Sequence, residues 1–351
     1  MYSEFNMGID QKIIIKMLKA SNGDSFIISW KDEAGVHKII IDTGIRNTAK
    51  VLIKEIESSD KIDALFITHV CNDHIGGIIK LLRNNAYLVR DKIHNIYINS
   101  PETIETNSSG NASVNDGYNL LSLLKEKNLE SRLKACLAED ADIYIGNASI
   151  TILSPSKESI ATKKMIRKWK ESTKKSGNAS SFNKHTKESF LKIEELSKLP
   201  LQKAKSENED YINASSMAFI FKVNKKSILL LGDSHPNSVI NMLEKKALCL
   251  KFDAVKVSHH GSQYNINEQF LEKVKSQNYI ISTNGGRGSS KHPDSITLAK
   301  LFKSNIDEYG NINFFFNYPQ SNFNEHLKGF IEDSENYTNL CLNFDQKEVV
   351  I

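Results

Sequence analysis

The residues best suited to chemistry in this chain lie in one short segment, Thr68–Gly77. Four side chains that bind transition metals occur there within six positions, namely His69, Cys71, Asp73 and His74. They directly follow the apolar run Ala64–Ile67, which predicts a buried strand. Imidazole, thiolate and carboxylate groups are the usual zinc ligands, so a strand that ends here would deliver a metal site into the following loop.

Other polar residues with metal-binding side chains also follow apolar runs. Asp42 follows Ile39–Ile41, Asp233 follows Leu229–Leu231 and a Gly, and the pair His259-His260 follows Ala254–Val257 with one Ser between. A late His292-Pro293 follows a glycine-rich loop. If each run is a strand, the strands would deliver their terminal side chains to one rim of the protein.

The pattern of the whole chain alternates strands with helices. Strands are expected at Lys12–Leu18, Ser25–Trp30, Lys38–Asp42, Asp63–Thr68, Ile93–Asn99, Asp142–Ile145, Ser149–Leu153, Met217–Val223, Ser227–Leu231, Ala254–Ser258, Tyr279–Ser282, Asn313–Asn317 and Thr338–Phe344. Helices are expected at Thr48–Ser58, Gly76–Asn84, Tyr118–Lys127, Ser238–Lys246, Asn267–Val274 and Ser295–Phe302. Strands grouped in both halves, with helices between them, predict an α/β fold of two sheets packed face to face with helices outside.

Composition limits the class of protein. The 351 residues are 40% hydrophobic and 25% charged, which is typical of a globular protein. No apolar run approaches the roughly 18 residues that span a bilayer. The four cysteines are scattered without CxxC pairs, which argues against a disulfide framework. We therefore expect one cytoplasmic domain over residues 1–351 with no membrane contact, including a C-terminal extension at about 310–351.

A basic segment interrupts the pattern. Lys157–Lys205 contains fourteen Lys and Arg against five Glu, a local net charge of about +9 in a chain of +4. It reads as a partly helical insertion at about 157–210. Two interpretations stay open: a solvated loop or lid, and an arm that binds a polyanion such as nucleic acid.

The ordered motifs IDTG, THxCxDHxGG, LLGD and SHHGS resemble those of the metallo-β-lactamase superfamily. With Asn22–Ile28 and the late His-Pro, they are similar to the ComEC-like branch, the hydrolase domain of competence DNA-uptake proteins and its stand-alone relatives. The resemblance implies an αββα sandwich of two mixed sheets. It also implies a first zinc site at His69 and Cys71, a second at Asp73, His74 and His259, and a bridging Asp233.

The chain departs from the superfamily pattern at two places. Cys71 replaces the middle His of HxHxDH, so it is either a thiolate ligand or a small buried residue in a degenerate site. The separate third-motif His has no clear counterpart. Of the adjacent pair, His259 is the favoured ligand because strand geometry directs only one of two neighbours at the rim, although His260 is the alternative.

The resemblance implies hydrolysis by one or two Zn²⁺ ions, with Mn²⁺ as the alternative ion and a metal-bound hydroxide as the nucleophile. Asp73, His260 and His292 are the candidate catalytic residues. The basic insertion favours a phosphodiesterase or nuclease that binds nucleic acid. The alternatives are a hydrolase of a small ester, lactone or phosphorylcholine-type substrate, and a weakened subunit that depends on a protein partner. The oligomeric state is left open.

Overall fold

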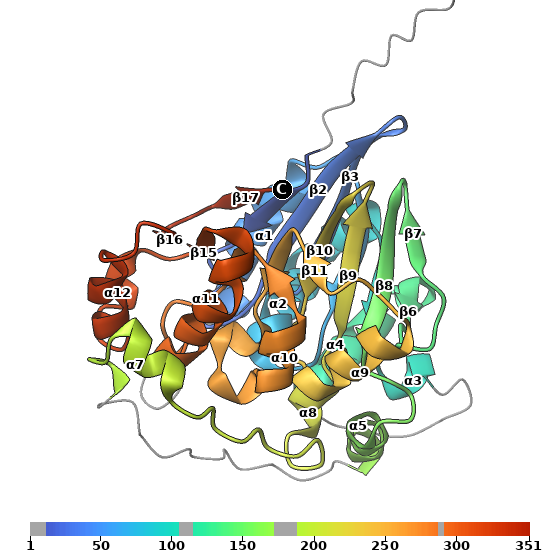
Figure 1. Ribbon diagram of the computed structural model, residues 1–351. Coiled ribbons are helices and arrows are strands. Elements are labelled where there is room, and N and C mark those ends of the chain that lie inside the picture. Colours follow the sequence, from blue (N-terminus) through green and yellow to red (C-terminus); the bar gives the residue numbers. More distant parts are fainter. Residues whose placement is uncertain (1–11, 105–114, 172–187, 287–290) are drawn as a thin grey trace, which may run out of the picture.

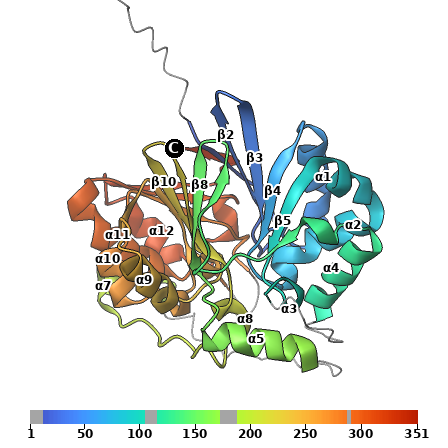
Figure 2. The same cartoon turned by 90° about the vertical axis from the view of Figure 1, so that its right-hand side faces the viewer.

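Two large β-sheets pack face to face, and helices cover the outer surface of each sheet (Figures 1 and 2). The structure is a computed structural model that describes residues 12–104, 115–171, 188–286 and 291–351. Its architecture is the αββα sandwich of mixed sheets, which confirms the predicted fold class. Every helix in these ranges is too short or too polar to cross a lipid bilayer.

The first sheet has seven strands. Their order is β17 (Glu348–Val350), β1 (Ile14–Met17), β2 (Phe26–Asp32), β3 (Gly35–Ile41), β4 (Ile62–Ile67), β5 (Ile93–Ile98) and β6 (Leu133–Lys134). Strands β3 to β6 are parallel, whereas β17, β1, β2 and β3 pair in antiparallel fashion. Because β3 and β4 are parallel, Asp42 and His69 both emerge at the same end of the sheet.

The second sheet has eight strands. Their order is β16 (Leu340–Asn343), β15 (Ile312–Phe316), β14 (Asn278–Ile281), β12 (Ala254–Lys256), β10 (Lys226–Leu230), β9 (Ala218–Val223), β8 (Ala148–Ser154) and β7 (Ile143–Ile145). Strands β10, β12, β14, β15 and β16 are parallel. A separate ribbon pairs β11 (Lys251–Phe252) with β13 (Lys275–Ser276). The parallel pair β10 and β12 delivers Asp233 and the two adjacent histidines to one edge.

Alternation along β4 explains the layered core. Ala64 and Phe66 face the cluster between the sheets, while Leu65 and Ile67 face the helices, as the period of two in a strand requires. The first sheet is covered by η1 (Arg46–Thr48), α1 (Ala49–Glu57), α2 (Asn72–Lys92), α3 (Pro101–Ile104), α4 (Asn115–Glu126) and η2 (Glu130–Arg132). The second is covered by α9 (Pro236–Lys245), α10 (Glu268–Lys273) and α11 (Ser295–Tyr309).

The C-terminal segment contributes to both sheets. From about residue 310 it forms β15, η5 (Gln320–Asn322), α12 (Lys328–Ser334) and β16 beside the second sheet, and then β17 pairs with β1 in the first. This segment therefore joins the outer edges of the two sheets (Figure 1).

The basic insertion crosses the lower edge of the sandwich. It contains α5 (Ile160–Glu171) and α7 (Ile193–Lys198) and is followed by α8 (Tyr211–Ala214), and α5 lies beneath the two halves (Figure 2). Helix α5 buries Ala161, Met165 and Ile166, so its apolar side is packed. Residues 172–187 of the insertion lie outside the described ranges. The end of the molecule reached by β4, β10 and β12 is the end that carries α5 and α8 (Figure 1).

Candidate metal centre

The loop after β4 and the first turn of α2 carry three of the expected ligands. His69 follows the strand by two residues, and Asp73 and His74 lie in the first turn of the helix. The helix begins at Asn72, four residues before the predicted start at Gly76. An acidic side chain in the first turn is favoured by the partial positive charge of the helix N-terminus. The early start therefore places Asp73 and His74 on a helix rather than in a loop.

Gly76 and Gly77 allow α2 to pack closely against the loop after β3. A Cβ atom at Gly77 would lie 2.1 Å from Thr43 O, and one at Gly76 would lie 2.7 Å from Arg46 N. These close contacts are with the backbone of residues 43–46, which hydrogen-bonds to the same helix turn through Thr43 N and His74 O at 2.7 Å.

His259 and His260 lie in a left-handed turn, η3 (Ser258–Gly261), beyond the end of β12. Their φ angles are 46° and 57°, and Gly261 has a φ of 92°. Non-glycine residues pay a steric cost in this region, and such strain concentrates at functional sites. Because the strand has ended at Lys256, strand alternation does not apply, and both rings reach the rim.

The Asp233 carboxylate lies among three of these rings. Its Oδ2 is 3.7 Å from His69 Nε2 and 3.7 Å from His259 Nε2, and its Oδ1 is 3.6 Å from His74 Nε2. On the other side of His74, His260 Nε2 is 3.8 Å from Asp73 Oδ2. These contacts belong to two of the three groups of potential ligand atoms in the described ranges, His69/His74/Asp233 and Asp73/His74/His260. His259 lies beside the first group through its contact with Asp233.

Buried ligand atoms without partners mark this centre. Within the described ranges, the Nε2 atoms of His69, His74 and His260 and the Oδ1 of Asp233 are buried with no hydrogen-bond partner. Buried polar atoms are normally paired, so four such atoms around one point need an additional group. Imidazole nitrogens and carboxylate oxygens form the donor set of zinc and similar transition metals. The residues therefore fit a divalent metal ion.

Asp42 orients His74 through a hydrogen bond. Its Oδ2 accepts hydrogen bonds from His74 Nδ1 and Thr68 Oγ1, both at 2.7 Å, and its Oδ1 accepts one from Thr68 N at 2.8 Å. His74 donates through Nδ1, which leaves Nε2 facing Asp233. A carboxylate behind a ligating histidine is the usual support in metal sites. Asp24, Asp42 and His74 together form the third group of potential ligand atoms.

Polar neighbours also hold the other ligand candidates. Ser216 Oγ lies 3.3 Å from His69 Nδ1 and accepts a hydrogen bond from Asp233 N at 3.0 Å. Asn265 Oδ1 lies 2.9 Å from His259 Nδ1, and its Nδ2 donates to Asp233 O at 2.9 Å. Each of these two polar side chains thus supports one imidazole and the Asp233 backbone together.

The charged neighbours and the burial of each side chain give the site residues different pKa values. Burial and the neighbouring His74 lower the pKa of His69 to about 3. Burial also disfavours charge on His74, but Asp233 and Asp42 outweigh it and raise its pKa well above the usual value. Burial opposes ionisation of Asp73, yet the hydrogen bond with His260 and the charge of His74 lower its pKa to about 2. A cation bound here would replace the protons that now balance these carboxylates.

Two of the expected site residues, Cys71 and His292, lie at the edge of the metal centre. Cys71 Sγ is 4.0 Å from Asn213 Oδ1 on α8, and Cys71 belongs to none of the metal-binding groups found in the described ranges. The His292 ring lies 5.5 Å from the His259 ring, centroid to centroid, and His292 Nδ1 is 3.6 Å from Asp294 Oδ2. His292 is therefore adjacent to the centre without belonging to its ligand groups.

Three residues that the sequence analysis did not assign to the site, Asn22, Asp24 and Lys256, lie around the metal centre. Asn22 Nδ2 donates to Asp73 Oδ2 at 3.2 Å, and the buried Asp24 lies 3.4 Å from His260 Nδ1. Lys256 is 2% exposed and pairs with Asp24. The signal for Lys256 was present in the sequence, because a lysine within the apolar run Ala254–Val257 must find a buried partner.

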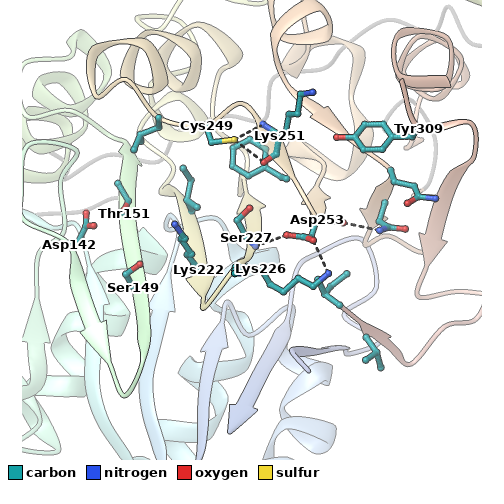
Figure 3. Close-up of a pocket in the computed structure, with 18 residues that line it drawn as sticks. Asp142, Ser149, Thr151, Lys222, Lys226, Ser227, Cys249, Lys251, Asp253 and Tyr309 are labelled. Atoms are coloured by element: carbon teal, nitrogen blue, oxygen red, sulfur yellow. Dashed lines mark hydrogen bonds and ion pairs between the residues drawn. The ribbon is translucent and has the colours of Figure 1, made fainter. Parts of the chain in front are cut away.

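A separate pocket lies on the outer face of the second sheet (Figure 3). It has a volume of about 710 Å³ and is lined by residues such as Ser149, Lys222, Lys226, Asp253 and Tyr309. None of its lining residues belongs to the metal-binding groups. The chemistry of the centre therefore does not extend into this pocket.

Comparison with known proteins found one matching family profile and several similar solved structures. A family profile described as anti-Pycsar protein Apyc1 matches residues 24–107, the part that carries Asp42, His69, Asp73 and His74. No curated protein sequence matches the chain.

Several solved structures of low sequence identity are similar to this chain. The metallo-β-lactamase fold protein YhfI from Bacillus subtilis is 10% identical with a TM-score of 0.44, covering 97% of this chain and 99% of that one. Zn²⁺-bound PqqB from Methylobacterium extorquens is 11% identical with a TM-score of 0.44, covering 96% and 99%. A diphosphatase of the PhnP family is 9% identical with a TM-score of 0.43, covering 97% of each chain.

Proposed function

We propose that this protein is a metal-dependent hydrolase, and more specifically a zinc phosphodiesterase or nuclease related to the ComEC-like branch. The observation that carries the proposal is the set of buried, unpartnered atoms on His69, His74, His260 and Asp233, which face one another where both sheets end. Such an arrangement is costly without a cation and favourable with one.

Two metal positions are proposed around Asp233. His69 and Asp233 would hold one ion, with His259 as the further imidazole beside Asp233 Oδ2. The group Asp73/His74/His260 would hold the other. Zinc is the first choice, because imidazoles dominate the donor set, and manganese is the alternative. When bound, such ions activate water for hydrolysis and stabilise charge on the displaced oxygen.

Protein groups at the open side of the centre would handle substrate and protons. The side chains of Asp73 and His259 are 26% and 29% exposed, whereas His69 and His74 are almost fully buried. Substrate therefore approaches past Asp73 and His259. His292, which is 18% exposed and lies beside His259, would donate a proton to the leaving oxygen.

The basic insertion supports a phosphodiester substrate. Helix α5 of the insertion packs on α8, the next helix after the insertion, and α8 supplies the Asn213 that contacts Cys71 in the metal loop. The insertion has a net charge of about +9, which attracts a phosphate backbone. We therefore propose nucleic acid as the partner and substrate class.

A small ester, lactone or phosphorylcholine-type substrate is the second candidate. It is favoured by the local contacts of two basic residues of α5. Lys163 forms an ion pair with Glu158 at 2.7 Å, and Lys164 lies 5.0 Å from the ring centroid of Tyr211. Lysines engaged in this way hold the insertion in place as a lid and offer less charge to a polyanion.

Metal content and hydrolysis of a substrate panel test the proposal. The purified protein should bind zinc or manganese and hydrolyse DNA, RNA or a small chromogenic phosphodiester, and Asp233→Ala should abolish this activity. Neutralising Lys163, Lys164 and Arg167 together should weaken nucleic-acid binding, flatten its salt dependence and leave the small phosphodiester reaction intact. Metal binding without hydrolysis of any phosphodiester, together with turnover of a lactone, would select the second candidate. A protein that binds no divalent metal would contradict both.

A further inference from the structure

A buried ion pair joins the two sheets directly behind the proposed metal centre. Asp24 lies in the loop between β1 and β2 of the first sheet, and Lys256 is the last residue of β12 in the second. Lys256 Nζ contacts Asp24 Oδ2, and each side chain is only 2% exposed. A lysine and an aspartate this deeply buried are costly to desolvate, and many such pairs are less stabilising than apolar residues of the same size.

The pair contacts the backbone or side chain of each loop that carries a ligand candidate. Asp24 Oδ1 lies 3.4 Å from His260 Nδ1, and Asp24 N donates to Asp73 O at 3.3 Å. Lys256 Nζ donates to Gly232 O at 3.1 Å, directly before Asp233. The same Gly232 oxygen accepts a hydrogen bond from His259 N at 3.0 Å. Two charged residues thus connect the loops after β4, β10 and β12.

The His260 ring is held on its rear side by the first of these contacts. Its Nδ1 donates to Ser282 O at 2.8 Å, with Asp24 Oδ1 next to it. This hydrogen bond at Nδ1 fixes the ring so that Nε2 faces Asp73. A hydrogen bond to Ser282 O alone would let the His260 ring tilt, whereas the Asp24 carboxylate adds a second, charged contact.

We propose that Asp24 and Lys256 are positioning residues for the metal centre: the inter-sheet ion pair keeps His260 and Asp73 aligned with the Asp233 loop. This inference rests on the metal centre of the proposed function, but it does not depend on which substrate is hydrolysed. A pair that served only stability would be replaceable by apolar side chains without effect on metal affinity.

A double replacement separates the two roles. Lys256→Met alone leaves the Asp24 charge buried and should lower both the melting temperature and zinc affinity. Asp24→Leu combined with Lys256→Met removes both charges, so the melting temperature of the metal-free protein should recover toward that of the parent. Zinc affinity should nevertheless stay roughly 10- to 100-fold weaker, as for other supporting residues of metal ligands.

Zinc affinity is measured by competition with a chromophoric chelator, and Lys226→Met is the control. Lys226 pairs with Asp253 at 3.0 Å on the outer face of the same sheet, so its loss should leave zinc affinity unchanged. A double variant that is as stable as the parent and binds zinc equally well would overturn the inference. A double variant that stays unfolded would also overturn it, because the pair would then be structural. A parent protein that binds no zinc would instead refute the metal centre itself.

Discussion

Removing the Asp42 carboxylate should weaken both the fold and the metal centre. Asp42 is fully buried and accepts three hydrogen bonds, two from Thr68 and one from His74. Asp42→Ala leaves three buried donors unsatisfied at about 1–3 kcal/mol each, and taking the lower part of that range gives about 3–6 kcal/mol. A chain of 351 residues has an unfolding entropy of about 0.7 kcal/mol/K, so this loss of stability should lower the melting temperature by about 4–8 °C.

The same change should reduce zinc affinity by roughly 10- to 100-fold, because His74 loses the acceptor that fixes its tautomer. Thermal denaturation of the metal-free protein and a chelator competition measure the two effects separately. Asp63→Ala is the matched control, since this carboxylate in β4 accepts a hydrogen bond from Lys38 N and makes no contact with the metal-binding groups. It should cost stability without affecting zinc. An Asp42→Ala protein with parental zinc affinity would refute the orienting role.

Three further predictions concern the surroundings of the centre. Cys71→Ser should change zinc affinity less than about threefold, since Sγ contacts Asn213 outside the ligand groups, and a loss above tenfold would establish a thiolate ligand. Burial lowers the pKa of His260, but neighbouring carboxylates outweigh it and raise the pKa to about 10. Stability from this proton is complete below about pH 6.5 and is lost as pH rises toward 10, so melting temperatures of the metal-free protein should fall over that window less steeply in His260→Asn. Gly77→Ala should destabilise the protein by about 1–3 kcal/mol in chemical denaturation, because its Cβ would overlap Thr43 O; unchanged stability would show that helix α2 can shift freely.

The sequence predicted the strands that end in ligand candidates because their signals are local. Apolar runs of three or four residues with Asp or His shortly after them identified β3, β4, β10 and β12, and each strand begins and ends within a few residues of its expected bounds. The grouping of predicted strands in both halves of the chain also predicted the two-sheet sandwich. Strand β17 and helix α12 were missed, since three to seven residues of mixed polarity carry no periodic signal and depend on tertiary packing.

The other differences between the sequence prediction and the structure come from backbone conformation and from non-local contacts. The sequence treated His259 and His260 as consecutive strand residues, and nothing in their types announces a left-handed turn. The contact between Asp24 and Lys256 joins opposite sheets, so neither residue alone identifies its partner. The early start of α2 depends on how the helix packs against residues 43–46, which is again a non-local contact.

The placement of ligand candidates on loops of both sheets has a consequence for the order of assembly. His74 belongs to the first sheet's layer and His260 to the second, and more than half of the chain separates them. Their Nε2 atoms come together only after the sheets have docked, so a nascent chain offers metal ions neither the His69/His74/Asp233 group nor the Asp73/His74/His260 group until the C-terminal half has been synthesised. Metal loading should therefore follow folding instead of nucleating it. Refolding rates in chelator and in zinc should be equal, while unfolding should be slower with zinc.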